Sequence, residues 1–255
     1  GSRYEIRNLT AANDFWLLVG GRMITLNDII QDIENTFADC KICFDHNDVP
    51  ADLCLPKSWE RFGLNLESSP VYPQSWNSFS NEFPSVISLF NGSLLGTVLM
   101  LGASVKLVYV FHDANGLYYY VGGMPVEAYT ADNVNFNGLP ARLQEFYRDV
   151  HDGYTFFPAR SMGPQSLGDQ PRVSDLVDED DDSFAKQWIT VFSNGAGDYV
   201  AVDAAKRGDT EGLIWWHEHP MVPELDVDVF EVMNAWMAIF LEDTKPRDEI
   251  IAKLH

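Results

Sequence analysis

The chain has 255 residues, of which 46% are hydrophobic and 13% aromatic, a composition that excludes a disordered protein and allows a sizeable buried core. It carries 38 acidic and 17 basic residues, a formal net charge of −21 at pH 7. A field of this sign repels nucleic acid and anionic membranes, and it would attract a basic partner protein. General solubility is the alternative interpretation of the same charge.

The N-terminal residues predict a strand followed by a helix. Residues 1–14 are polar, and we interpret them as a flexible lead that begins with a tag remnant, Gly1-Ser2. A short strand is expected from Phe15 to Val19. Thr25 then caps a helix in which Asp28 stands at the third position. Apolar residues recur at helical spacing along one face of that helix, namely Leu26, Ile29, Ile30, Ile33 and Phe37.

Three cysteines are too few for a disulfide framework. Cys40 and Cys43 form a CxxC pair inside a strand-like run, and Cys54 is the only other thiol. A zinc site needs more ligands than this pair supplies, and a redox pair would open a helix. We therefore expect reduced structural thiols, a cytoplasmic protein and no cofactor.

Residues 67–84 are rich in serine, proline and aromatic side chains, which is typical of a loop. Its aromatic residues are either anchors for a partner or anchors that hold the loop on its own core, and the second interpretation is favoured: Tyr72, Trp76, Phe79 and Phe83. A short helix is expected to begin near Pro84. Next, two apolar runs flank Asp113-Ala-Asn-Gly116, the strongest hairpin signal in the chain.

The second half follows a recognisable order of elements. A helix opens at Leu139-Pro140 and ends before Asp152-Gly153, and a strand-like run follows at residues 154–158. Two further strand-like runs are Gly197-Asp-Tyr-Val-Ala-Val-Asp203 and Gly212-Leu-Ile-Trp-Trp-His217. Asp226 or Asp228 then caps a final helix whose apolar stripe predicts core packing.

Over residues 134–243 this order resembles the SUKH superfamily, the Smi/Knr-like domains. That pattern has a Leu-Pro-led helix, a Gly-Asp-Tyr strand, a strand of the Val-Tyr-Trp-Asp-His kind and a C-terminal helix. Where the family has an Asn-Gly-Gly-like turn, this chain has Asp152-Gly153 without a second glycine. The resemblance implies an immunity protein that neutralises a cognate toxin by stoichiometric binding. Such toxins are delivered by type VI or contact-dependent secretion, and many are nucleases.

Two segments are the predicted partner-binding residues. One is an acidic run in an irregular stretch between strands, which is suited to a basic groove: Asp178, Glu179, Asp180, Asp181 and Asp182. The other is the expected end of the strand at Trp216, His217 and Glu218, the position of the family's Asp-His or Asp-Glu. A solvated surface loop is the alternative for the acidic run. It lacks the alternating order of a calcium-binding loop.

The usual enzyme signatures are missing, and we expect no catalytic activity and no metal site. If the strand continued through this stretch, His217 and His219 would share one face and begin a zinc site, which leaves a metal-dependent hydrolase as an alternative. The turn at Asn194–Gly197 lacks the third glycine and the following helix of a phosphate loop. A regulatory scaffold module is a further alternative.

These patterns predict an α+β fold, with a mixed and largely antiparallel sheet packed by helices. The proposed division is the lead 1–14, an N-terminal α+β part 15–130, a SUKH-like domain 131–245 and a tail 246–255. A single domain with an extended N-terminal half is the alternative. The expected partner is a cognate protein toxin, not nucleic acid or a membrane.

Overall fold

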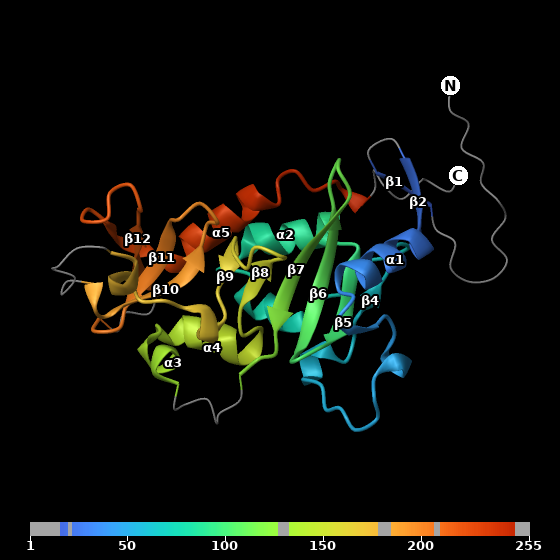
Figure 1. Ribbon diagram of the computed structural model, residues 1–255, viewed down its shortest axis with the longest axis horizontal. Coiled ribbons are helices and arrows are strands. Elements are labelled where there is room, and N and C mark those ends of the chain that lie inside the picture. Colours follow the sequence, from blue (N-terminus) through green and yellow to red (C-terminus); the bar gives the residue numbers. More distant parts are fainter. Residues whose placement is uncertain (1–15, 20–21, 127–132, 178–184, 207–209, 248–255) are drawn as a thin grey trace.

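The structure is a computed structural model of the chain, and it describes residues 16–19, 22–126, 133–177, 185–206 and 210–247. The acidic run 178–182, the predicted lead 1–14 and residues 248–255 of the predicted tail lie outside the described residues. The fold is α+β, as predicted, with two larger antiparallel sheets that lie beside each other along the long axis of the molecule (Figure 1).

The N-terminal half contains a two-stranded sheet and most of a six-stranded sheet. Its elements are β1 (Trp16–Val19), β2 (Arg22–Thr25), α1 (Leu26–Thr36), β3 (Lys41–Cys43), β4 (Gly63–Leu64), α2 (Pro84–Ser93), β5 (Gly96–Leu101), β6 (Val105–His112) and β7 (Leu117–Gly123). The C-terminal half continues with α3 (Val134–Gly138), α4 (Ala141–Asp149), β8 (Tyr154–Phe156), β9 (Gly163–Pro164), β10 (Trp188–Ser193), β11 (Tyr199–Asp203), β12 (Glu211–Trp215), β13 (Glu224–Asp228) and α5 (Val229–Phe240).

Helix α1 begins with the predicted capping box. The Thr25 hydroxyl accepts a hydrogen bond from the Asp28 N–H (3.0 Å), and the Asp28 carboxylate accepts one from the Thr25 N–H (2.9 Å). These two bonds satisfy backbone donors that the first helical turn leaves free. Ile29 and Ile33 are buried against the six-stranded sheet, which confirms the predicted apolar face.

The six-stranded sheet has the order β3-β5-β6-β7-β8, with β4 also paired to β5, and every pair is antiparallel. The predicted hairpin is confirmed by the pairing of β6 with β7. In its turn, the Asp113 carboxylate accepts hydrogen bonds from the N–H groups of Asn115 (2.7 Å) and Gly116 (3.0 Å). Alternate residues of β6 face opposite sides, so Tyr109 enters the main core while Val108 packs under α1.

The five-stranded sheet has the order β13-β12-β11-β10-β9, and all its pairs are antiparallel. Helix α5 lies along one face of this sheet and continues beside α2, which covers the neighbouring sheet (Figure 1). The Asn234 side chain of α5 accepts a hydrogen bond from the Ser85 N–H of α2 (3.1 Å). The N-cap of α5 is Asp228, which confirms one of the two predicted caps, Asp226 or Asp228.

One hydrophobic core extends across both larger sheets. It includes Tyr109 of the six-stranded sheet, Phe192 of the five-stranded sheet and Met237 of α5. Strand β8, which belongs to the proposed C-terminal domain, pairs with β7 of the proposed N-terminal part. The division at residues 130 and 131 stays a prediction, and these contacts cross it.

The aromatic loop before α2 is held on this core. The side chains of Tyr72, Trp76, Phe79 and Phe83 are all buried. The Trp76 ring contacts Phe90, Phe146 and several other aromatic rings at their edges. The interpretation of these residues as exposed partner anchors is therefore wrong, and the self-packing interpretation is confirmed. No helix among the described residues is long and apolar enough to cross a membrane.

Candidate protein-binding surface

The connection between β12 and β13 differs from its prediction. Strand β12 ends at Trp215, two residues before the predicted end at His217. The chain then turns, and the His219 N–H donates to the Trp216 carbonyl (3.1 Å). The indole N–H of Trp215 also donates to the Pro220 carbonyl (3.1 Å), which holds the turn on the strand. His217 and His219 therefore do not share a strand face, and the predicted extension of the strand to His217 is wrong.

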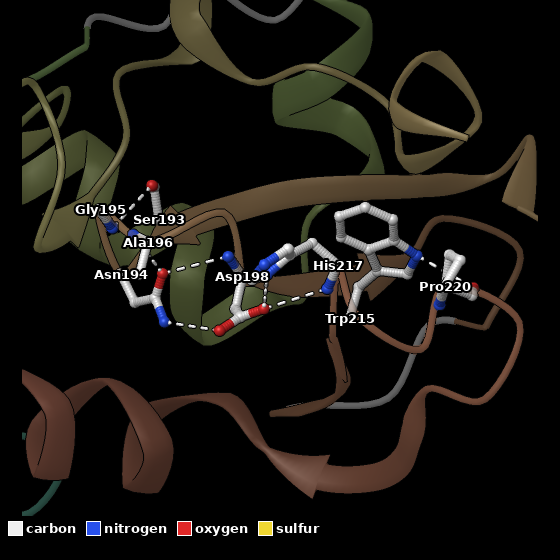
Figure 2. Close-up of polar contacts among 8 residues, drawn as sticks. All are labelled: Ser193, Asn194, Gly195, Ala196, Asp198, Trp215, His217 and Pro220. Carbon is white, nitrogen blue, oxygen red and sulfur yellow. Dashed lines mark hydrogen bonds and ion pairs between the residues drawn. The ribbon is translucent and has the colours of Figure 1, made fainter. Parts of the chain in front are cut away.

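His217 is held by the turn that connects β10 to β11 (Figure 2). Its Nδ1 lies 2.7 Å from Oδ1 of Asp198, and its backbone N–H donates to the same oxygen at 3.0 Å. The other carboxylate oxygen of Asp198 accepts from the Asn194 side-chain amide (3.0 Å). Burial opposes ionisation of Asp198, but these hydrogen bonds outweigh it and lower the pKa of its carboxyl group.

The Asn194–Gly197 turn uses its own backbone donors. The Asn194 side-chain oxygen accepts hydrogen bonds from the N–H groups of Ala196 (2.8 Å) and Asp198 (3.1 Å), as Figure 2 shows. Gly197 has a φ of 97°, and a Cβ there would lie 3.1 Å from the His217 ring. The turn thus positions Asp198 against His217, and its bonded N–H groups are not directed at a phosphate.

Large apolar side chains are exposed on this connection and on the strand that follows. The exposed fractions are 49% for Met221, 72% for Val222 and 51% for Leu225. Trp216 is half-buried, and its ring centroid lies 6.1 Å from that of Trp236 on α5. Leu225 lies beside Trp188 and Leu213, on the sheet face opposite α5, so Met221 and Val222 are the exposed apolar pair of the connection itself. Large exposed apolar side chains can mark interaction sites on folded proteins.

Carboxylates accompany these apolar residues. Glu218, Glu224 and Asp226 are exposed on the same connection and on β13, the edge strand of the five-stranded sheet. Residues 210–244 contain no lysine or arginine but have acidic residues at Glu211, Glu218, Glu224, Asp226, Asp228, Glu231, Glu242 and Asp243. We call residues 216–226 together with Trp236 the β12–β13 surface.

The predicted partner-binding residues are only partly brought together. Trp216, His217 and Glu218 belong to the β12–β13 surface, whereas the acidic run 178–182 lies outside the described residues. The nearest described residues on either side of this run, Val177 and Ala185, pack with Trp215 on the sheet face opposite α5. Trp216 contacts α5, so it lies toward the other face.

Sequence reasoning missed Met221, Val222 and the role of Asp198. A signal for the first two was present, because Pro220 and Pro223 enclose them and keep them out of regular strand or helix. The partner of His217 had no local signal, since Asp198 precedes it by 19 residues and reaches it only through the pairing of β11 with β12.

Among the described residues, no three histidine, cysteine or acidic side chains are grouped so that they could hold a metal ion. His217 is hydrogen-bonded to Asp198 through Nδ1. All three cysteines are free; Cys43 is buried, and its thiol donates to the Asp48 carbonyl (3.4 Å). Burial raises the pKa of the Cys43 thiol, as expected for a structural and not a reactive cysteine.

No family model matches this chain, and neither a curated protein nor a solved structure matches it.

Proposed function

We propose that this protein is a SUKH-type immunity protein that binds a secreted bacterial toxin with a basic surface and neutralises it by stoichiometric association. The order of elements supports the proposal. Helix α4, strands β11 and β12 and helix α5 occur in the order that the resemblance implies, with β8 to β10 before β11 and β13 before α5. A net charge of −21 suits a partner that presents a basic face, such as a nuclease.

The observation that carries the proposal is the composition of the β12–β13 surface. Met221 and Val222 are exposed apolar side chains, and the charged residues around them in sequence are all acidic. In protein interfaces, apolar anchors at the centre supply most of the affinity, and a charged rim supplies specificity and rapid encounter. A basic partner with an apolar pocket fits both parts of this surface.

The hydrogen bonds around His217 would keep the surface in one conformation before binding. Asp198 holds both the ring and the backbone N–H of His217, and Trp215 holds Pro220. A surface that is ordered in advance loses less conformational entropy when the partner binds. Inhibition would follow from occupation of the toxin's active face or from retention of the toxin in an inactive complex.

The proposal is tested by co-expression with the protein encoded directly upstream of this one. The expected result is that the upstream protein alone arrests growth, that this protein restores growth, and that the two purified proteins bind in a 1:1 ratio by titration calorimetry. Absence of both rescue and binding would overturn the proposal.

The surface itself is tested by the double variant Met221→Asp with Val222→Asp. We expect about a thousandfold weaker binding, because removal of each central apolar anchor costs about 2 kcal/mol or more. The matched control is Val134→Asp on α3, since Val134 is also exposed, at 69%. Equal affinity of the double variant and the control would place the interface elsewhere.

A further inference from the structure

A cavity of about 310 Å³ lies beside the C-terminal end of α1 and shares no residue with the β12–β13 surface. Its volume is within the range of small-molecule sites in proteins. Strands β5 to β8 contribute one side of the lining, through Met100, Lys106 and Val121 among others. Residues 36–40 at the end of α1 and residues 157–169 after β8 complete it.

Two basic side chains line this cavity in a strongly acidic protein. Lys106 is half-buried on β6, and Arg160 is exposed in the segment after β8. Neither side chain forms an ion pair or a hydrogen bond with another described residue, although Lys106 interacts electrostatically with Asp152. Asp152 compensates part of the Lys106 charge, whereas the Arg160 side chain has no described partner, and together the two cations can bind an anionic group of a ligand.

The backbone of Arg160 is in an unfavourable conformation. Its φ is 53°, in the left-handed region where glycine is favoured over residues with a Cβ. Met162, two residues later, has a φ of 62°. Non-glycine residues in such conformations are held there by the surrounding structure, and they cluster at active sites and ligand-binding sites.

The lining also contains an unsatisfied buried acceptor. Gln165 is 6% exposed, and its Nε2 donates to the Asp169 carbonyl (3.0 Å). Its Oε1 is buried and has no hydrogen-bond partner among the described residues. Buried polar atoms are nearly always hydrogen-bonded, so this oxygen is suited to accept a hydrogen bond from a ligand. Three acidic residues, Asp39, Asp152 and Asp169, line the same cavity and favour a cationic donor.

Aromatic and aliphatic side chains form an apolar wall of the cavity. Phe37, Phe156 and Phe157 contribute, together with Met100 and Val121. The cavity thus combines two cationic side chains, three carboxylates, an amide oxygen without a described partner, and an apolar wall.

We propose that this cavity binds a small zwitterionic molecule of the amino-acid type with an apolar side chain. Its carboxylate would pair with Lys106 and Arg160, and its ammonium group would be recognised by the acidic residues and Gln165. Its side chain would pack on the phenylalanine rings. This site goes beyond the proposed toxin binding and does not depend on it.

The ligand class is tested by titration calorimetry on the full chain with L-phenylalanine, L-leucine and L-methionine. Two half-analogues of phenylalanine complete the set: 3-phenylpropionate lacks the ammonium group, and phenethylamine lacks the carboxylate. We expect saturable binding of at least one amino acid, and at least about tenfold weaker binding of the half-analogues, because each lacks one of the two charged groups and its contacts. Failure of all three amino acids to bind, or equal binding of the half-analogues, would overturn the proposal.

The site is tested with Arg160→Gly and Lys106→Ala. Glycine accepts the left-handed conformation, so Arg160→Gly should keep or raise the melting temperature while it weakens amino-acid binding about tenfold. Arg148→Ala is the control, because Arg148 is an exposed arginine of α4 outside the cavity. Unchanged affinity in Arg160→Gly would exclude the assigned carboxylate site, whether or not Lys106→Ala folds.

Discussion

His151 is part of a chain of hydrogen bonds that runs through the aromatic core from Trp76 to the Gly123 carbonyl. The Trp76 indole N–H donates to the Tyr109 hydroxyl (2.8 Å), whose oxygen lies 2.6 Å from His151 Nε2. On the other side of the ring, Nδ1 lies 2.8 Å from the Gly123 carbonyl oxygen. Because this carbonyl can only accept, Nδ1 carries the proton, and Nε2 accepts from Tyr109. The imidazole is therefore held neutral in a single tautomer.

This neutral state makes stability dependent on pH. Burial lowers the pKa of His151 from its ordinary 6.5 to about 4, while the bond to Gly123 acts in the opposite direction. The unfolded chain takes up its proton near pH 6.5, but the folded chain does so only near pH 4. The stabilisation from the neutral His151 is thus fully present above pH 6.5 and is lost as the pH falls to about 4. The total loss in the free energy of unfolding is on the order of 3 kcal/mol. Burial also lowers the pKa of His112 to about 4, so its protonation destabilises the folded chain over the same pH range.

Urea unfolding between pH 7 and pH 5 measures this effect above the range in which most carboxylates titrate. We expect the unfolding free energy to fall over this interval. In His151→Gln the decline should be smaller, because glutamine can accept from Tyr109 but does not titrate. A decline of the same size in the variant would show that His151 is not the group responsible.

At the scale of single elements, local signals were sufficient for several predictions. The capping box at Thr25, the Asn-Gly turn between β6 and β7 and the proline at the start of α2 each act within a few residues. The end of β12 was misplaced because it depends on a turn and on the Trp215 contact with Pro220. Such contacts follow from the surrounding fold and not from the alternation of apolar residues.

The cap of α5 joins the edge strand β13 to the helix that covers the sheet. Asp228 accepts hydrogen bonds from the N–H groups of Phe230 (2.9 Å) and Glu231 (3.0 Å). Its other oxygen accepts from the Thr210 hydroxyl (2.9 Å). The carboxylate thus satisfies two free donors of the helix and connects it to the segment before β12.

Asp228→Ala should lower the free energy of unfolding by about 1 to 2 kcal/mol, the usual cost of losing such a cap. Asp228→Asn should lose much less, because asparagine caps almost equally well. Glu224→Ala is the control for loss of one exposed negative charge on the same strand. If Glu224→Ala were as destabilising as Asp228→Ala, charge and not capping would explain the result. Urea unfolding of the three variants gives the comparison.

At the scale of the whole molecule, the class of fold followed from the sequence, but its assembly did not. Strand β8 pairs with β7, and the main core includes both Tyr109 and Phe192, so residues far apart in the chain are joined. The exposure of Met221 and Val222 has the same origin, because an apolar residue in a connection is buried or exposed according to what the fold places over it. The cavity beside α1 likewise forms only when three separate segments meet.

The negative charge of the whole molecule gives the last prediction, which rests on the proposed function. Charges act on encounter over roughly 8 Å at physiological ionic strength, whereas contacts at the interface also determine how long the complex lasts. Replacing Asp178, Glu179, Asp180, Asp181 and Asp182 with Asn or Gln should therefore slow association of the toxin without changing its dissociation. The second variant, Glu218→Gln with Glu224→Gln and Asp226→Asn, should slow association and also speed dissociation, because these charges belong to the β12–β13 surface.

Stopped-flow measurements at low and high salt distinguish the two variants. In the parent protein and in the variant of the acidic run, added salt should lower the association rate, since the remaining field still steers the partner. Faster dissociation in the acidic-run variant, with unchanged dissociation in the β12–β13 variant, would reverse the assignment and move the interface to the acidic run. An association rate that does not depend on salt in the parent protein would exclude electrostatic steering, and with it the basic partner that the charge of this chain suggests.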